Sequence, residues 1–375
     1  MARGTIPGLR LSYATKQQRA EIYHDPHSVE GMIVPSGRVA LVGAGAFGRF
    51  CLDVYSAAPD LSVVAVADPS AAALARVRAI GARLETDWRP LLHDDSIEVI
   101  HVATPPYLRG DVIAAAFDAG KSVFCEKPLA LSLREADAMI AQAAARELAL
   151  SVNYVMRYQP AYALLERLAN SGLVGSLRTI SFQNFAQLVP PDHWFWDPAR
   201  SGGIFVEHGV HFFDAYARVA GAPLQVHGTA PRREAVDATI RYAGGALGRF
   251  YHEFAYPHAV EQTLGISLFE RGSVEIEGWI PERMSGSVLA SPEAVQEVAQ
   301  STGIDVHITE DTATRFAVSF PNRQASYRAA ILAGMRDVLR RHRDPTYHML
   351  VSTEDARASL ALALAAQEAA SRAQF

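Results

Sequence analysis

Short, largely apolar runs alternate with Ala-rich stretches between residues 37 and 152. The runs are rich in Val, which is typical of strands that are buried on both faces of a sheet. The stretches between them have the length of helices, and strands that alternate with helices indicate βαβ units and a parallel sheet. We expect strands at 38–42, 61–67, 98–104 and 121–125 and helices at 47–58, 70–80, 107–119 and 132–148.

The pattern changes after about residue 153, where strand-like segments dominate. From residue 224 onward these segments follow one another without long helices between them, and turns such as Gly244-Gly245 separate them. Successive strands joined by short turns indicate an antiparallel or mixed sheet. We expect strands at 177–185, 224–229, 236–242, 247–254, 262–268 and 273–277, and helices at 160–170, 324–341 and 353–372.

These two patterns predict two domains after an N-terminal extension. The fold class is α/β plus α+β: a domain with a parallel sheet and alternating helices, then a domain built on an antiparallel or mixed sheet. We place the extension at 1–36, the first domain at 37–152 and the second domain at 153–352. The last helix, 353–375, is a candidate to pack back on the first domain.

Composition and charge exclude several classes of function. The net charge of −5 argues against nucleic acid as a partner, because nonspecific binding to polyanions depends on an excess of Lys and Arg. The longest apolar runs are much shorter than a membrane span, and the first 30 residues lack the apolar core of a secretory signal. Only two cysteines occur, Cys51 and Cys125, so we expect no disulfide framework and a cytoplasmic location.

A glycine motif follows the first expected strand and opens the first expected helix. Residues 43–48 match G-x-G-x-x-G through Gly43, Gly45 and Gly48, and Asp68 ends the second strand 20 residues later. This context is specific for dinucleotide binding, with the diphosphate at the helix N-terminus beside Ala46 and Phe47. Asp68 would accept hydrogen bonds from the adenosine ribose and repel a 2′-phosphate, which favours NAD over NADP. The alternative is a glycine-rich turn with an incidental Asp.

The Cys125-Glu126-Lys127-Pro128 turn closes the fourth expected strand, at the sheet edge where open α/β folds bind ligands. A Lys at this edge can hydrogen-bond and polarise a substrate oxygen beside the nicotinamide. Pro128 restricts the backbone of Lys127 to extended conformations, which helps to fix the turn. The alternative is a surface Lys paired with Glu126.

Residues 207–211 read Glu-His-Gly-Val-His, a second concentration of titratable groups. On an α-helix Glu207 and His211 share one face, and a His can exchange a proton near neutral pH while a carboxylate orients its ring. His208 points about 100° away from Glu207 on such a helix. The alternatives are an exposed helical ion pair and a zinc site. Because H-E-x-x-H and cysteine clusters are absent from the sequence, we expect no metal.

Further polar and aromatic residues are candidates for substrate binding. Trp194 and Trp196 lie on a Pro-rich segment, and indole faces suit the C–H surfaces of sugar rings. Packing of both indoles into the core is the alternative. Tyr154, Arg157 and His208 are the remaining candidates, and a surface or packing role is the alternative for each.

Several of these motifs together resemble the glucose–fructose oxidoreductase, inositol dehydrogenase and MocA family, over residues 37 to the C-terminus. They are Gly43–Gly48, Asp68, Thr104-Pro105-Pro106, Glu126-Lys127-Pro128, Asn153-Tyr154 with Arg157, Trp194–Pro198, Ser201-Gly202-Gly203 and Glu207–His211 with Asp214. The chain departs from the family's usual residues at Glu207 (Asp), Ser201 (Gly), Arg109 (His) and Phe195 (Arg). These departures make it unsafe to transfer a substrate from any one member.

The resemblance implies that 37–152 is a Rossmann NAD-binding domain and that 153–352 is a substrate-binding and oligomerisation domain built on a large, open, mostly antiparallel β-sheet. It also implies bound NAD(P), a homodimer or homotetramer formed through the C-terminal sheet, and a carbohydrate or polyol substrate. It assigns proton transfer to His211 with Glu207, polarisation of the same oxygen to Lys127, and contacts with the cofactor to Thr104, Pro105, Glu126 and Lys127. We therefore expect an NAD(H)-dependent oxidoreductase acting on a secondary alcohol or ketone of a sugar, inositol or glycoside. Two alternatives stay open. One is a redox-neutral glycosidase or epimerase that oxidises a sugar transiently, and the other is a non-catalytic NAD-binding sensor.

Overall fold

The computed structural model describes residues 36–77 and 81–373, so the expected N-terminal extension lies almost wholly outside the described residues. The described chain forms two compact units. The parallel-sheet unit comprises 36–155 with Arg328–Arg357, and the large-sheet unit comprises Met156–Tyr327 with 358–373. Each unit is described by itself below.

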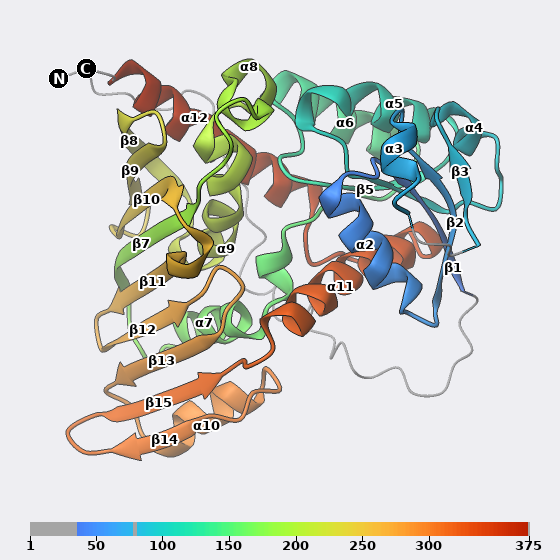
Figure 1. Cartoon of the computed structure of the whole chain (residues 1–375). Helices are drawn as coiled ribbons and strands as arrows, with labels where there is room; N and C mark the ends of the chain where they lie inside the picture. The colour runs from blue at the N-terminus through green and yellow to red at the C-terminus, as the bar shows by residue number, and fades with distance from the viewer. Residues whose placement is uncertain (1–35, 78–80, 374–375) are drawn as a thin grey trace. The chain divides into compact units, whose positions relative to one another are not determined.

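The parallel-sheet unit is built on a six-stranded sheet in the order β3-β2-β1-β4-β5-β6 (Figure 1). Every neighbouring pair in it is parallel. β4, β5 and β6 are buried throughout, as expected for strands covered on both faces. The strands are β1 (Gly37–Val42), β2 (Leu61–Ala67), β3 (Arg83–Glu85), β4 (Val99–Val102), β5 (Ser122–Cys125) and β6 (Leu150–Val152).

The helices of this unit follow the strands in alternation, which confirms the expected βαβ pattern. α6 begins where predicted: the Ser132 side chain caps it by accepting a hydrogen bond from the Glu135 amide at 3.2 Å. The expected helix at 70–80 is wrong in length, because α3 ends at Leu74 although Ala-rich sequence continues. The helices are α2 (Ala46–Ser56), α3 (Ala71–Leu74), α4 (Arg89–Leu92), α5 (Gly110–Asp118) and α6 (Leu133–Ala145).

The large-sheet unit contains a nine-stranded sheet in the order β14-β15-β13-β12-β11-β7-β10-β9-β8 (Figure 1). β7 and β10 pair in parallel and the other neighbours are antiparallel, which confirms the mostly antiparallel sheet. The strands are β7 (Leu177–Gln187), β8 (Pro223–Arg232), β9 (Ala235–Tyr242), β10 (Leu247–Tyr256), β11 (Gln262–Phe269), β12 (Gly272–Glu277), β13 (Arg283–Val288), β14 (His307–Glu310) and β15 (Thr314–Ser319).

One face of this sheet carries the core of the unit. Phe182 on β7 and Phe250 on β10 are fully buried. They pack against Phe212 and Phe213 of α9 (Val210–Ala220), with ring centroids 4.2 and 5.0 Å apart. α7 (Pro160–Ser171) and α9 therefore cover one face of the sheet (Figure 1). Side chains at alternate positions, such as Gln183, point to the opposite face.

The C-terminal helices do not follow the boundaries expected from the sequence. Residues from Arg328, in α11 (Arg323–Arg343), belong to the parallel-sheet unit, where Arg336 pairs with Asp60 at 2.8 Å. In α12 (Thr353–Arg372) the residues from Ala358 belong to the large-sheet unit, where Gln367 accepts a hydrogen bond from the Phe205 amide at 3.0 Å. Each compact unit is therefore built from segments that lie far apart in the sequence.

Candidate active site

The glycine motif has the geometry of a phosphate-binding turn. Gly43 has a φ of +105°, and a Cβ on Gly48 would lie 1.9 Å from the Gly43 carbonyl oxygen, so neither position accepts a side chain. A Cβ on Gly45 would meet no described atom within 4 Å, which leaves open space beside the turn. α2 begins at Ala46 and Phe47 with no side-chain cap and no acidic residue in its first turn. Its amides are thus available to an anion.

Asp68 lies at the end of β2, beside this turn. Its carboxylate accepts hydrogen bonds from the Ala44 amide at 2.7 Å and the Ser70 amide at 2.8 Å. A carboxylate has about four lone-pair sites, so two backbone donors leave capacity for ribose hydroxyls. Arg49 donates to the Ala44 carbonyl at 2.7 Å, a support for the turn that the sequence reasoning did not identify.

The loops after β4 and β5 are joined by a buried arginine. Thr104 and Pro105 follow β4, and Arg109 precedes α5 with only 1% of its surface exposed. The Arg109 guanidinium donates to the carbonyl of Thr104 at 2.6 Å and to the carbonyls of Glu126 and Pro128. It therefore ties the Thr-Pro loop to the Glu-Lys-Pro turn.

The Glu126 carboxylate points into the interior rather than toward solvent. It accepts a hydrogen bond from the Asn153 amide at 2.7 Å and lies 3.1 Å from Nε2 of His101. The other ring nitrogen of His101 lies 2.9 Å from the Tyr55 hydroxyl. These distances fit a hydrogen bond from the Tyr55 hydroxyl to Nδ1 of His101. They also fit a second one from Nε2–H of His101 to the Glu126 carboxylate. Sequence reasoning missed His101 and Tyr55. The only available signal was a His within an otherwise apolar strand.

Lys127 is half-buried between Glu126 and Pro128, which are both buried. The Lys127–Pro128 peptide bond is cis. Cys125 precedes them in β5, and burial raises the pKa of its thiol to about 11, so it is not a nucleophile near neutral pH. Cys51, His101 and Glu126 offer ligand atoms within 4.8 Å of one another. Both ring nitrogens of His101 already have partners there, which argues for a hydrogen-bond network rather than a metal site.

The Glu-His-Gly-Val-His segment is not a regular α-helix. Phe205–Gly209 is a π-helix, and α9 begins at Val210, so Glu207 and His211 lie on different elements. His211 is buried in the first turn of α9, and Glu207 is half-buried. π-Bulges of this kind are frequent at functional sites.

His208 faces the large sheet. Its Nε2 lies 3.2 Å from the Asn184 amide nitrogen, and its ring packs edge-on against His252 and Phe254. His252 is fully buried, and desolvation lowers its pKa to about 3, so it stays neutral. His208 therefore packs from the π-helix against His252 and Phe254 of β10.

Arg157 is held by an acidic partner on α9. Its Nε and Nη2 donate to the two carboxylate oxygens of Asp214 at 2.6 and 2.8 Å, and both side chains are buried. The Ser359 hydroxyl donates to the same carboxylate at 3.0 Å. This ion pair lies one turn beyond His211 and fixes α9 to the chain before α7.

The aromatic candidates differ in their surroundings. The Trp196 indole N–H donates to the carbonyls of Val189 and Pro190 within its own loop, and Arg233 stacks on its ring at 5.0 Å. Trp194 is half-buried, with its ring beside that of His193. Tyr154 is fully buried in the parallel-sheet unit. The structure thus gathers the glycine turn, Asp68, Thr104, Pro105, Glu126 and Lys127 in one unit, and Arg157, Trp194, Trp196, Glu207, His208 and His211 in the other.

Comparison with known families matches both parts of the chain. Residues 37–154 match the model described as "Oxidoreductase family, NAD-binding Rossmann fold", and residues 162–275 match "GFO/IDH/MocA C-terminal domain". The chain belongs to the Gfo/Idh/MocA family.

Relatives within the Gfo/Idh/MocA family support this placement. A scyllo-inositol 2-dehydrogenase (NAD(+)) of Bacillus subtilis (strain 168) is 30% identical over 192 residues, which cover 50% of this chain and 55% of that protein. An inositol 2-dehydrogenase of Rhizobium meliloti (strain 1021) is 30% identical over 210 residues, 55% of this chain and 62% of that one. The matched segments span little more than half the length of these relatives.

A solved structure shows the same fold over nearly the whole chain. It is a levoglucosan dehydrogenase in complex with NADH and L-sorbose, with a TM-score of 0.75 and 18% identity over 91% of this chain and 98% of that one. The two-unit Gfo/Idh/MocA fold, with its parallel sheet and its large mostly antiparallel sheet, is therefore the fold of this chain.

The parallel-sheet unit of this Gfo/Idh/MocA chain is an NAD-binding Rossmann fold, and its geometry fits that cofactor. The open side of Gly45 leaves room for the diphosphate, and the uncapped start of α2 supplies amides to it. The remaining acceptor capacity of Asp68 suits ribose hydroxyls.

Replacing Asp68 with Ser is expected to weaken NAD⁺ binding roughly tenfold, since a hydrogen bond to a charged group contributes about 1.5–3 kcal/mol. NADP⁺ binding should improve, because the variant removes a carboxylate that repels a 2′-phosphate. Calorimetric titration with both cofactors measures the two effects. Asp53→Ser, which changes an exposed carboxylate on α2, is the matched control. A wild-type protein that binds NADP⁺ more tightly than NAD⁺ would contradict this role of Asp68.

Proposed function

We propose that the protein is an NAD(H)-dependent oxidoreductase that transfers a hydride between the nicotinamide and a secondary alcohol or ketone of a sugar, inositol or glycoside. The observation that carries the proposal is the Glu126-Lys127-Pro128 turn, held at the strand ends of an NAD-binding sheet by Arg109 and by the His101–Glu126–Asn153 network. Such a turn presents one fixed ammonium group beside the cofactor domain. Relatives named as inositol dehydrogenases, each 30% identical over the matched segment, support the substrate class.

The roles of the residues follow from their chemistry. The nicotinamide supplies the hydride acceptor or donor when it is bound. Lys127 donates a hydrogen bond to the reacting oxygen and polarises it, while Glu126 and Arg109 keep the turn in place. His211 takes the hydroxyl proton during oxidation and returns it during reduction, with Glu207 stabilising the charged ring. Thr104 and Pro105 line the cofactor side of the same strand ends.

The substrate-binding residues are proposed with different roles. Trp194 offers an indole face to a sugar ring, and Tyr154, Trp196 and His208 shape the surroundings through packing. Arg157 acts by holding α9, since two of its nitrogens donate to Asp214.

A panel of free sugars, inositols and glycosides with NAD⁺, followed at the absorbance of reduced nicotinamide, tests the proposal. Chromatography of products from the same reactions distinguishes net oxidation from an internal redox cycle. A rise in absorbance with one compound, which is lost in Lys127→Met, is the expected result. Products without a rise would identify a redox-neutral enzyme, and neither signal across the panel would favour a sensor.

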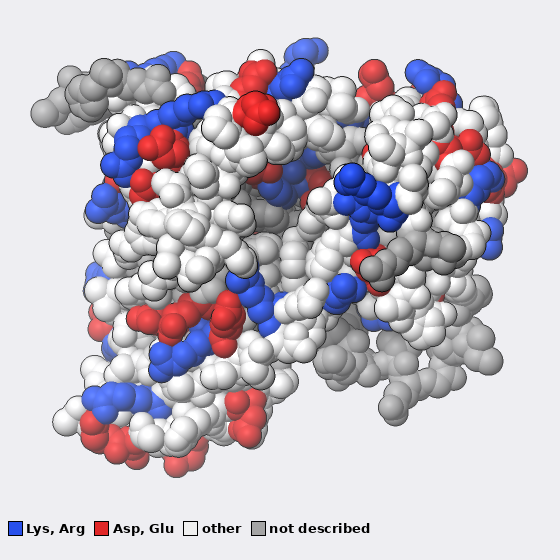
Figure 2. Space-filling view, in the orientation of Figure 1, with Lys and Arg blue, Asp and Glu red and all other residues white. Residues whose placement is uncertain are grey.

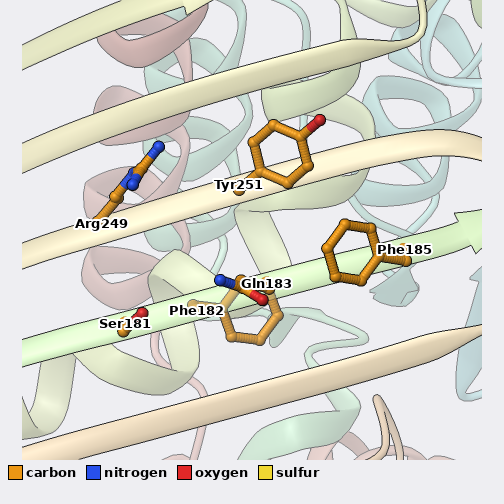
Figure 3. A pocket seen from close by; sticks show the side chains of 6 residues that line it. All are labelled: Ser181, Phe182, Gln183, Phe185, Arg249 and Tyr251. Carbon is orange, nitrogen blue, oxygen red and sulfur yellow. The ribbon is translucent and has the colours of Figure 1, made fainter.

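We propose that copies of the chain associate through the open face of the large sheet, as a homodimer or homotetramer. Figure 3 shows this face from the side opposite the helices, with Phe185 and Tyr251 beside Gln183 and Arg249. These residues line a hollow of about 290 Å³. Leu264, Ile266 and Leu268 follow on β11, and Leu268 is 46% exposed. Exposed aromatic and aliphatic side chains mixed with polar ones are typical of interfaces between subunits.

Leu268→Glu is expected to lower the mass measured by light scattering to that of a smaller assembly, because it replaces an exposed apolar side chain of this face with a charge. Leu84→Glu is the matched control, since Leu84 is 45% exposed and lies on the other sheet. An unchanged mass for Leu268→Glu would exclude this face as the interface.

A small-molecule substrate and a cytoplasmic location complete the proposal. Acidic and basic side chains are interspersed over the face of the molecule in Figure 2, and no extended basic patch is seen on it. Both cysteines are free and buried, as suits a reducing compartment. Among the described residues, no helix combines the length and apolarity that crossing a membrane requires.

A further inference from the structure

Arg109 is a buried cation whose direct partners are neutral groups. It is among the largest fully buried side chains of the described residues, and its guanidinium donates to three carbonyl oxygens, of Thr104, Glu126 and Pro128, and to the Cys125 sulfur. Within the described part of the chain, no carboxylate lies within ion-pair distance of its guanidinium. Buried charges are ordinarily paired directly with an opposite charge, so this arrangement has an effect on its surroundings that requires explanation.

The position of this charge is defined by the sheet. Thr104 follows β4, and Glu126 and Pro128 follow β5, so the guanidinium lies at the carboxyl ends of the two strands beside β1 on one side of the sheet. In a sheet of this order each half binds one mononucleotide of the cofactor. Asp68 at the end of β2 marks the other half as the adenosine side. Arg109 therefore lies in the half that serves the nicotinamide.

The carboxylates beside it are held by other groups. Glu126 is directed into the interior toward Asn153 and His101, and Glu135 accepts a hydrogen bond from the Leu131 amide at 3.3 Å. An oxidised nicotinamide ring carries a positive charge and a reduced ring is neutral. A fixed cation in a buried, low-dielectric setting thus acts against the oxidised ring and leaves the reduced one unaffected.

We propose that Arg109 makes the protein bind NADH more tightly than NAD⁺, and so acts as a positioning residue that also sets the redox preference of the site. The proposal rests on the NAD site described above and deepens the proposed function, because it specifies which form of the cofactor the resting protein holds. Its carbonyl contacts position the two loops, and its charge discriminates between the two oxidation states.

Two substitutions separate the charge from the contacts. Arg109→Gln keeps a hydrogen-bond donor but removes the charge, whereas Arg109→Lys keeps the charge but loses the planar fork that reaches three carbonyls. The protein is stripped of retained cofactor, and Kd values for NADH, NAD⁺ and ADP-ribose are measured by calorimetry. ADP-ribose keeps the adenosine, the diphosphate and the second ribose, so it reports on every cofactor contact except those of the nicotinamide ring.

In the wild-type protein the ratio of Kd for NAD⁺ to Kd for NADH is expected to exceed one. Arg109→Gln should lower this ratio roughly tenfold, the order expected when one unit charge is removed from a partly buried site. Arg109→Lys should keep most of the ratio even where both affinities fall. ADP-ribose binding should stay within about twofold in both variants, because ADP-ribose lacks the nicotinamide ring on which the charge acts.

Several results would overturn the proposal. A wild-type ratio of one or less does so without any variant, and this measurement stands even where Arg109→Gln fails to fold. Equal weakening of NADH and NAD⁺ in Arg109→Gln, with the ratio unchanged, would reduce Arg109 to a structural clamp. Because no sugar substrate is needed, failure of the substrate panel leaves this measurement intact, and loss of ADP-ribose binding would point to the cofactor site as a whole.

Discussion

Replacing His211 with alanine is expected to lower kcat for the substrate found by the sugar panel roughly 10³-fold, while NADH binding stays within about twofold. General acid–base catalysis by a positioned side chain contributes about 10²–10⁴-fold, so loss of the group that exchanges the hydroxyl proton should fall in this range. Lys127→Met should have an effect of similar size, since it removes the only cation of the Glu-Lys-Pro turn.

The structure gives His211 a fixed position from which to act. It lies in the first turn of α9, directly after the π-helix, with only 6% of its surface exposed. One turn further along, the Asp214–Arg157 ion pair holds the helix. A buried and anchored imidazole loses little freedom when substrate binds, which is the condition for efficient proton transfer.

Steady-state kinetics measures the loss of kcat, and calorimetric titration measures NADH binding. His227→Ala, which removes an exposed His from β8 of the same unit, is the matched control and should retain full activity. Full activity in His211→Ala would assign proton exchange to another group. A loss of NADH binding in parallel with activity would instead indicate that the variant disturbs folding.

The sequence predicted the parallel-sheet unit well because its signals are local. β1, β2, β4 and β5 were recognised from apolar runs, and the glycine turn and Asp68 from a spacing imposed by the cofactor. The hairpin turns at Gly244-Gly245 and Arg271-Gly272 were likewise recognised, since each joins two neighbouring strands over a few residues.

Elements that depend on partners far along the chain escaped prediction. β13, β14 and β15 are short and polar, with the sequence Arg-Met-Ser-Gly-Ser-Val in β13, and become strands only because they pair with one another and with β12. β3 and β6 have three residues each and were missed for the same reason. Strand propensity is weak at such lengths compared with the effect of tertiary pairing.

The same limit applies to the candidate site. His101 and Tyr55 are 46 residues apart, and nothing in their local sequence shows that their side chains meet. The π-helix at Phe205–Gly209 follows an ordinary helical pattern, so its insertion was not visible either. Arg157 was predicted to bind substrate, and the local sequence did not show that it pairs with Asp214, which lies 57 residues away.

Replacing Asp214, the partner of Arg157, with alanine is expected to lower the free energy of unfolding by about 3–5 kcal/mol. Asp214 is fully buried, and Arg157 donates to both of its carboxylate oxygens. Removing the carboxylate takes both of these charged hydrogen bonds from a buried guanidinium, and a broken buried ion pair costs about this much. The Ser359 hydroxyl loses its acceptor in the same variant.

Denaturant unfolding of the wild-type and variant proteins measures this loss, and an exposed pair of the same chemistry provides the control. Arg336 donates to both carboxylate oxygens of Asp60 at 2.8 Å, and the two side chains are 39% and 40% exposed, so Asp60→Ala should cost less than about 1 kcal/mol. A similar cost for both variants would mean that burial does not matter at Asp214. The double variant Arg157→Met with Asp214→Leu should recover most of the stability lost in Asp214→Ala. Apolar side chains of similar volume remove both charges together, so neither is left buried alone.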